Sequence, residues 1–265
     1  MTLAALAPIE RRLRERVFAP PPRLSLPEWA DTYAYVHVGA EKGRWRTDRA
    51  PYQRGIMEAI SDPAIPEVVW MKSARTGYTE LITKAIARHA HIDPCETLVV
   101  QPDQFTAERW SRTYLAPEFR DTPALQGLVS EFAEGGARHS GNTILRKEYP
   151  GGDVTCVWAS SANRLRFSTN RLVIFDEIDG YPPNKEGDPI KLGEKRAETY
   201  GRRRKVIKGS SPTVKGFSRI ERAFLQSDQR FYHVPCPDCG HQQRLVWATV
   251  RGEEGLDQQL ITSIA

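Results

Sequence analysis

Eight consecutive residues combine two cations, a glycine and several hydroxyl groups between a short apolar run and a helical pattern. They are Lys72, Ser73, Ala74, Arg75, Thr76, Gly77, Tyr78 and Thr79. A turn of this kind can bind phosphate, because a strand aims it, backbone N–H groups line it and the next helix N-terminus favours an anion. We therefore predict a phosphate-binding loop at residues 72–79. The alternative is an ordinary turn between a strand and a helix.

The loop departs from the usual phosphate-binding pattern G-x-x-x-x-G-K-[ST]. With the hydroxyl ends aligned, Gly77 and Thr79 match, but Lys72 replaces the first glycine and Tyr78 replaces the lysine. A lysine at the start of the loop can still reach a β- or γ-phosphate from the opposite side, and Thr79 stays in place to bind Mg²⁺. Arg75 is a second candidate cation. The segment predicts a nucleotide site with a displaced lysine.

Two adjacent carboxylates, Asp176 and Glu177, end a second apolar run. Successive residues that leave a strand point in different directions, so the two acids can do different work. Asp176 would bind the hydration shell of Mg²⁺, and Glu177 would orient or deprotonate the attacking water in phosphoryl transfer. The alternative is that the pair only precedes a turn at residues 180–183. In combination with the loop that begins at Lys72, the nucleotide hypothesis is favoured.

Two more segments can complete a nucleotide site. A third strand-like run ends in a turn with the hydroxyl residues Ser210, Ser211 and Thr213. Ligands gather at the carboxyl ends of parallel strands, so these residues can sense a γ-phosphate; the alternative is an ordinary Ser-Pro turn. Upstream, Gln53 can hydrogen-bond an adenine edge and Tyr52 can stack on the base.

A pair of thiols near the end of the chain, Cys236 and Cys239, has the C-x-x-C spacing of half a zinc knuckle. Structural zinc takes four tetrahedral ligands. His233 and His241 are close in sequence, but four ligands within nine residues would be strained. We expect either a zinc site completed from elsewhere or a knuckle without metal.

Alternating hydrophobic periodicity predicts the elements that position these residues. Helices are expected from about residue 26 and at 52–60, 79–91, 105–114 and 217–225, and strands at 67–71, 97–100, 154–158, 172–175 and 205–208. The alternation of strands and helices predicts a three-layer α/β fold with a mainly parallel sheet. Residues 231–234 and 243–246 are expected to flank the thiols as a small zinc-ribbon-like hairpin.

Composition narrows the class of protein. The chain has 265 residues, of which 40% are hydrophobic and 27% charged, which argues against disorder, a coiled coil or a fibre. We expect no membrane association, since every apolar run is shorter than a bilayer requires, and no secretory signal. The net charge is +5. Arg164, Arg166 and the basic run 202–205 are candidates for DNA contact or for an arginine finger, and solvated surface is the alternative.

Seven stretches together resemble the ATPase domain of the large terminase subunit of tailed bacteriophages, in the lambda-type (gpA) family. The likeness runs from about residue 45 to about residue 246. The stretches are Gly43-Arg-Trp with Pro51-Tyr-Gln-Arg, Ser61-Asp-Pro, Met71-Lys-Ser-Ala-Arg-Thr-Gly-Tyr-Thr79, Ser160-Ser-Ala-Asn163, Phe175-Asp-Glu-Ile-Asp-Gly-Tyr181, Gly209-Ser-Ser-Pro-Thr213 and Cys236-Pro-Asp-Cys-Gly240.

The resemblance implies a P-loop NTPase of the ASCE type, and the family shares the displaced lysine. It implies that Lys72 and Thr79 serve the phosphates and Mg²⁺ and that the two adjacent acids form the Walker B pair. It also implies a coupling motif at residues 209–213 and an adenine-recognition motif that includes Gln53.

The family's function supplies further expectations. Its members hydrolyse ATP to package double-stranded viral DNA into procapsids in the host cytoplasm, as a homo-oligomeric ring that works with a small terminase subunit and the portal protein. We expect an N-terminal arm at 1–45, the ATPase domain at 46–229, the half knuckle at 230–250 and an irregular tail at 251–265. The family's nuclease would begin after the thiol pair, so nuclease activity is not expected here, and truncation, a frameshift or a split gene is plausible.

Two other functions compete with the motor hypothesis. One is a catalytically silent remnant that binds DNA or terminase and portal partners; the intact Lys72, Thr79, Asp176 and Glu177 argue against it. The other is a helicase-like P-loop ATPase, for which the chain lacks the length of a second motor domain.

Overall fold

A six-stranded sheet is the centre of the computed structural model, which describes residues 23–39, 41–129, 142–184, 186–244 and 263–264. Five neighbouring strands run parallel, and the sixth, at one edge, is antiparallel to its neighbour. In spatial order the strands are β3 (Glu67–Met71), β8 (Lys205–Ser210), β7 (Leu172–Asp176), β4 (Glu96–Gln101), β6 (Gly152–Trp158) and β5 (Arg146–Tyr149). The expected mainly parallel sheet is confirmed.

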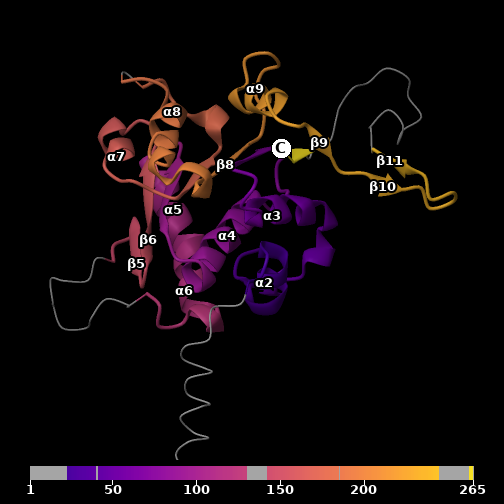
Figure 1. Cartoon of the computed structure of the whole chain (residues 1–265), viewed down its shortest axis with the longest axis horizontal. Coiled ribbons are helices and arrows are strands. Elements are labelled where there is room, and N and C mark those ends of the chain that lie inside the picture. Colours follow the sequence, from indigo (N-terminus) through magenta and orange to yellow (C-terminus); the bar gives the residue numbers. More distant parts are fainter. Residues whose placement is uncertain (1–22, 40, 130–141, 185, 245–262, 265) are drawn as a thin grey trace, which may run out of the picture.

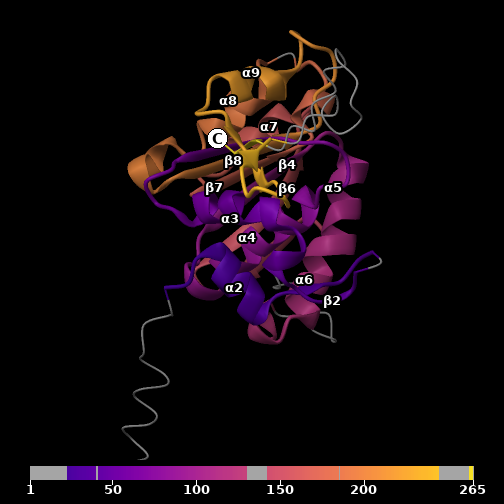
Figure 2. The same ribbon diagram turned by 90° about the vertical axis from the view of Figure 1, so that its right-hand side faces the viewer.

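Helices cover both faces of this sheet (Figures 1 and 2). The first face carries α2 (Leu26–Tyr33), α3 (Arg54–Ser61), α4 (Tyr78–Ile92), α5 (Gln104–Trp110) and α6 (Ala116–Asp121). A π-helical turn, Ser111–Leu115, joins α5 to α6. The second face carries α7 (Ala162–Arg166), α8 (Pro189–Glu194) and α9 (Arg219–Leu225). Short 3-10 turns lie at Thr47–Arg49, Pro51–Gln53, Pro123–Leu125, Ile178–Gly180 and Glu198–Arg203.

Two hydrophobic cores follow from the alternation of side chains along the strands. In β3, Val68 and Trp70 face the core on the α4 side, whereas Val69 and Met71 face the core on the α9 side. Strand β7 is buried along its whole length. Because both faces are covered, these strands read as continuous apolar runs in the sequence.

The N-terminal helix α2 packs on the first face. Leu26, Trp29 and Ala30 have no exposed surface and join the core shared with α3 and α4. A short hairpin follows, β1 (Tyr35–Val36) and β2 (Gly43–Arg44). Residues 1–22 of the expected arm and 251–262 of the expected tail lie outside the described residues. No helix in the described segments is long and apolar enough to span a bilayer.

The remaining strands are short and lie near the C-terminus. They are β9 (Arg230–Phe231), β10 (Val234–Pro235), β11 (Gln242–Gln243) and β12 (Ser263–Ile264). The hairpin β10–β11 projects from the body of the molecule, at the right of Figure 1. Most predicted helices and strands coincide with observed ones to within a few residues, whereas β1, β2, β5, β12, α6, α7 and α8 were not predicted. Residues 245–250 of the expected half knuckle, which include the end of its second expected strand, lie outside the described residues.

Candidate functional site

The carboxyl ends of neighbouring parallel strands meet at one edge of the sheet, where most of the predicted site residues lie. In the register of the sheet, Gly209 of β8 lies between Trp70 of β3 and Asp176 of β7. Val100 of β4 pairs with Phe175, so β4 ends at the same level. The segments that follow these strands therefore start side by side, which is the usual place of a ligand site in a parallel sheet.

Lys72 and Glu177, which are 105 positions apart in sequence, form an ion pair across this edge. The Lys72 Nζ lies 2.5 Å from Glu177 Oε1, with Lys72 6% exposed and the Glu177 side chain 44% exposed. Glu177 Oε2 accepts from the backbone N–H of Ser211 at 3.3 Å and from the Ser210 hydroxyl at 3.4 Å. The displaced cation, the second acid and the hydroxyl-rich turn thus meet at one point.

Tyr78, which occupies the usual lysine position, points into the sheet. Its hydroxyl donates to Phe175 O at 2.9 Å, and its ring makes an edge contact with Trp70 at 5.5 Å between centroids. Burial raises the pKa of Tyr78 well above its usual value, so the hydroxyl keeps the proton that it donates. The side chain braces the first turn of α4, and only its backbone N–H is left to face a phosphate.

Gly209 makes room for that tyrosine, and replacing it with alanine tests the packing. An alanine Cβ would lie 2.2 Å from the Tyr78 ring, which is buried and cannot move aside freely. We expect Gly209→Ala to lower the free energy of unfolding by about 2 kcal/mol, as overpacking does. Urea denaturation measures this, with Gly180→Ala as the control, since its Cβ would meet nothing closer than 3.7 Å. Equal stability of the two variants would contradict the tight contact.

The loop itself is held by the segment before α3. The Gln53 Nε2 donates to Thr76 O at 2.7 Å, and the Tyr52 hydroxyl donates to the same oxygen at 3.2 Å. Gly77 has a φ of +86°, and a Cβ there would lie 2.4 Å from Gln53 Nε2. Arg75 also has a positive φ, of +63°. The glycine is needed for both the left-handed backbone and the close approach of Gln53.

A cavity of about 670 Å³ opens beside this loop. Tyr52, Gln53 and residues 75–77 line one side, and the β1–β2 hairpin lines the other through Val36 and Arg44. The volume is typical of a small-molecule site. Gln53 Oε1 is buried and has no hydrogen-bond partner among the described residues, so it retains an acceptor for a ligand.

Asp176 is buried, and one of its oxygens has a partner that the sequence did not reveal. Gln101, the last residue of β4, donates from Nε2 to Asp176 Oδ2 at 3.0 Å. Asp176 Oδ1 has no partner in the part of the chain that the structure describes. Burial raises the pKa of Asp176 to about 6. The sequence held one signal for Gln101. It is a polar residue at the end of a predicted strand, as Asp176 is at the end of another.

Asp179 is a second residue that sequence reasoning left without a role. Its Oδ2 accepts from the backbone N–H and the hydroxyl of Thr213, both at 2.9 Å, and its Oδ1 accepts from Ile220 N at 2.8 Å. Its own backbone N–H donates to the Ser210 hydroxyl at 3.2 Å. Asp179 therefore ties the acidic segment to the hydroxyl-rich turn and to α9.

The other predicted loop residues lie as follows. Ala74 and Arg75 are exposed, while Ser73 and Thr79 are half-buried. Thr79 stands in the first turn of α4, where its carbonyl accepts the Thr83 hydroxyl at 2.7 Å. Arg75 borders the cavity, so its guanidinium is available to a bound anion.

The basic candidates separate in the structure. Arg164 stacks over the Trp158 ring, 4.6 Å from its centroid, and Arg166 pairs with Glu186. Lys205 was wrongly counted as a candidate for DNA contact, because its buried ammonium donates to backbone carbonyls at the end of α3, Ala59 O, Asp62 O and Ile65 O. Burial lowers the pKa of Lys205 to about 8.

The thiol pair lies in the β10–β11 hairpin. The Cys236 N–H donates to His241 O at 2.8 Å, which closes the turn, and both thiols are free. The described residues contain no group of three or more His, Cys, Asp or Glu side chains that could hold a metal ion. Because these two thiols supply only half of a tetrahedral site, the described residues do not complete a zinc site, and the zinc-ribbon expectation is not supported.

Comparisons with known proteins identify the family of this chain. Residues 39–261 match the family described as "Phage terminase large subunit gpA, ATPase domain". The chain is 34% identical to the large terminase subunit of Enterobacteria phage P21 over 85% of its length, and 34% identical to that of Escherichia phage lambda over 86%. It spans about a third of the length of these relatives, 35% and 36%.

A solved structure shares the fold. The crystal structure of the HK97 bacteriophage large terminase matches with a TM-score of 0.57 and 13% identity, over 78% of this chain and 41% of that one. The family match covers most of the chain and includes every predicted nucleotide-site residue. The protein therefore belongs to the gpA family of phage terminase large subunits, of which it contains the ATPase domain.

Proposed function

We propose that this chain is an ATP-driven motor domain that translocates double-stranded viral DNA into procapsids in the host cytoplasm. The observation that carries the proposal is the Lys72–Glu177 ion pair beside the buried, half-satisfied carboxylate of Asp176. In this proposal the domain works as a homo-oligomeric ring with a small terminase subunit and the portal protein, partners taken from family membership.

Asp176 and Thr79 would hold the magnesium ion of the nucleotide. The unpartnered Asp176 Oδ1 fits this role, since a buried carboxylate oxygen needs a donor or a cation. The pKa near 6 also fits, because a neighbouring divalent cation favours the charged form that burial disfavours. When bound, Mg²⁺ would neutralise negative charge on the β- and γ-phosphates.

Lys72, Glu177 and Arg75 would have separate roles in phosphoryl transfer. The Lys72 ammonium leaves Glu177 to bind phosphate oxygens, and this exchange frees the carboxylate. Glu177 then orients a water and accepts its proton while the water oxygen bonds to the γ-phosphorus and the β–γ bridge bond breaks. Backbone N–H groups of residues 73–79 and the Arg75 guanidinium stabilise the phosphates.

The hydroxyl-rich turn is proposed to sense the γ-phosphate. Ser210 and Ser211 contact Glu177, and Thr213 contacts Asp179, so movement of either acid on phosphate loss reaches the turn directly. At the opposite side of the loop, Tyr52 and Gln53 would contact adenine. The position of β8 between β3 and β7 supports an ASCE-type ATPase unit at residues 46–229. We propose residues 230–250 as a separate segment, of which the structure describes residues 230–244.

Phosphate release tests the proposal. The wild-type protein should hydrolyse ATP only with Mg²⁺ and faster with double-stranded DNA. Glu177→Gln keeps the shape but removes the base, so we expect turnover to fall about 100-fold. Glu198→Gln changes an exposed acid away from the site and should have no effect. Absence of wild-type turnover would favour the silent-remnant alternative, and turnover with single-stranded but not double-stranded DNA would favour the helicase-like one.

A further inference from the structure

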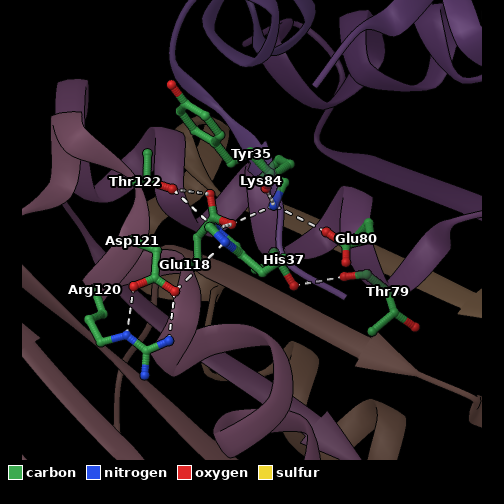
Figure 3. Close-up of polar contacts among 10 residues, drawn as sticks. Tyr35, His37, Thr79, Glu80, Lys84, Glu118, Arg120, Asp121 and Thr122 are labelled. Atoms are coloured by element: carbon green, nitrogen blue, oxygen red, sulfur yellow. Dashed lines mark hydrogen bonds and ion pairs between the residues drawn. The ribbon is translucent and has the colours of Figure 1, made fainter. Parts of the chain in front are cut away.

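A fully buried lysine lies two turns into α4, and the proposed ATP chemistry gives it no part. The Lys84 Nζ donates to Tyr35 O at 2.6 Å and pairs with Glu80 Oε2 at 3.1 Å and with Glu118 Oε2 (Figure 3). A lysine ammonium has three N–H donors, and here three acceptors surround it. Lys84 and Glu118 have no exposed surface at all.

The three acceptors belong to three different elements. Tyr35 is in β1, Glu80 is in the first turn of α4, and Glu118 is in α6. Glu118 also accepts the Thr122 hydroxyl at 3.4 Å and lies 3.3 Å from His37 Nε2, just after β1. Buried ion pairs contribute little net stability compared with apolar packing, so the main consequence of this cluster is geometric.

Two of the connected elements are walls of the cavity beside the phosphate loop. Glu80 lines the cavity from α4, and Val36 and Arg44 line it from the β1–β2 hairpin. A hairpin with two paired residues on each strand has little stability by itself, so contacts with neighbouring elements set its position. Arg44 donates to Thr32 O and Trp45 donates to Ala34 O, which connects the hairpin to the end of α2. Lys84 connects the hairpin to α4, the helix that follows the phosphate loop.

The phosphate loop is braced by a different set of contacts. Tyr52 and Gln53 hold Thr76 O, and Tyr78 holds Phe175 O. None of these contacts includes Lys84. Loss of the lysine should therefore move the hairpin wall and leave the phosphate cradle in place.

We infer that Lys84 is a positioning residue that places the β1–β2 hairpin and Glu80 around the base of the nucleotide. The inference rests on the proposed function, because it assumes that the cavity takes the base of ATP. Lys84 should affect binding of the two parts of ATP differently. Binding of the base depends on Lys84, whereas binding of the triphosphate does not.

A binding comparison on the whole chain tests this separation. The affinities of wild type and Lys84→Met for ATP and for inorganic tripolyphosphate are measured with Mg²⁺ by calorimetry. We expect the Kd for ATP to rise about 10-fold and the Kd for tripolyphosphate to change less than about 2-fold. In hydrolysis, KM should rise while kcat at saturating ATP stays within about 2-fold of wild type. Lys195→Met, which removes an exposed lysine, is the control.

Each other outcome is decisive. Equal weakening of both ligands, or a fall in kcat without a change in KM, would show that Lys84 supports the phosphate loop and would overturn the inference. An unchanged Kd for ATP would overturn it as well. If Lys84→Met does not fold, Lys84→Met with Glu118→Gln removes both buried charges and is measured in the same way. Failure of the wild type to bind ATP would instead overturn the proposed function.

Discussion

Replacing Lys72 with methionine is expected to lower ATP hydrolysis about 1,000-fold, the scale of losing a charged group that stabilises the transition state. Lys72 directly follows β3 and is buried, and its ammonium lies 2.5 Å from Glu177 Oε1. This position puts the charge at the proposed phosphate site. Phosphate release at saturating ATP measures the loss. Lys195→Met, at the exposed C-terminal end of α8, controls for removal of a lysine as such and should leave turnover unchanged.

A double variant tests whether the position of the lysine matters. Lys72→Met with Tyr78→Lys restores the usual order of the phosphate-loop pattern, yet we expect it to remain inactive. The side chain at position 78 points toward Phe175 O and packs against Gly209, so an ammonium there would be buried in the sheet instead of facing the loop. Recovery of more than about a tenth of wild-type turnover would contradict this account.

Replacing Asp176 with asparagine is expected to have opposite effects on activity and stability. Loss of the proposed magnesium ligand should lower hydrolysis about 1,000-fold, equivalent to about 4 kcal/mol of transition-state stabilisation. The protein without nucleotide should become more stable at pH 7.5 by about 3 kcal/mol, because asparagine carries no charge to bury and can still accept from Gln101. Phosphate release and urea denaturation measure the two effects.

The pH dependence identifies the cause of this stabilisation. The folded pKa of Asp176 is about 6, above the ordinary 3.8, so between these values the folded protein keeps a proton that the unfolded chain releases. The contribution of Asp176 to the free energy of unfolding therefore falls as pH rises through this window, and its full cost is present above pH 6. The advantage of Asp176→Asn should shrink toward zero near pH 4. Asp48→Asn, at an exposed acid, should show no such trend. A stability difference that is the same at both pH values would contradict burial as the cause.

Local sequence was sufficient to predict the principal elements. Apolar periodicity depends on which neighbours along the chain are buried together, so strands such as 67–71 and 172–175 were found almost to the residue. The edge strand β5 was not found, because it is three consecutive charged residues and one tyrosine and depends on pairing with β6. The short helices α7 and α8 were not found either, since five or six residues give little periodicity.

Residue types and spacing within single segments of the chain gave the resemblance to the gpA family, the predicted phosphate loop and the predicted pair of acids. Only the tertiary structure decided which elements lie side by side. It places β8 between β3 and β7 and brings Lys72 into contact with Glu177. It also shows that Gln101 and Asp179 support the site. It also decided that Tyr78 points into the sheet and that Lys84 joins three elements. The physical reason is that a motif records contacts between neighbours in the chain, whereas strand order and burial bring together residues a hundred positions apart.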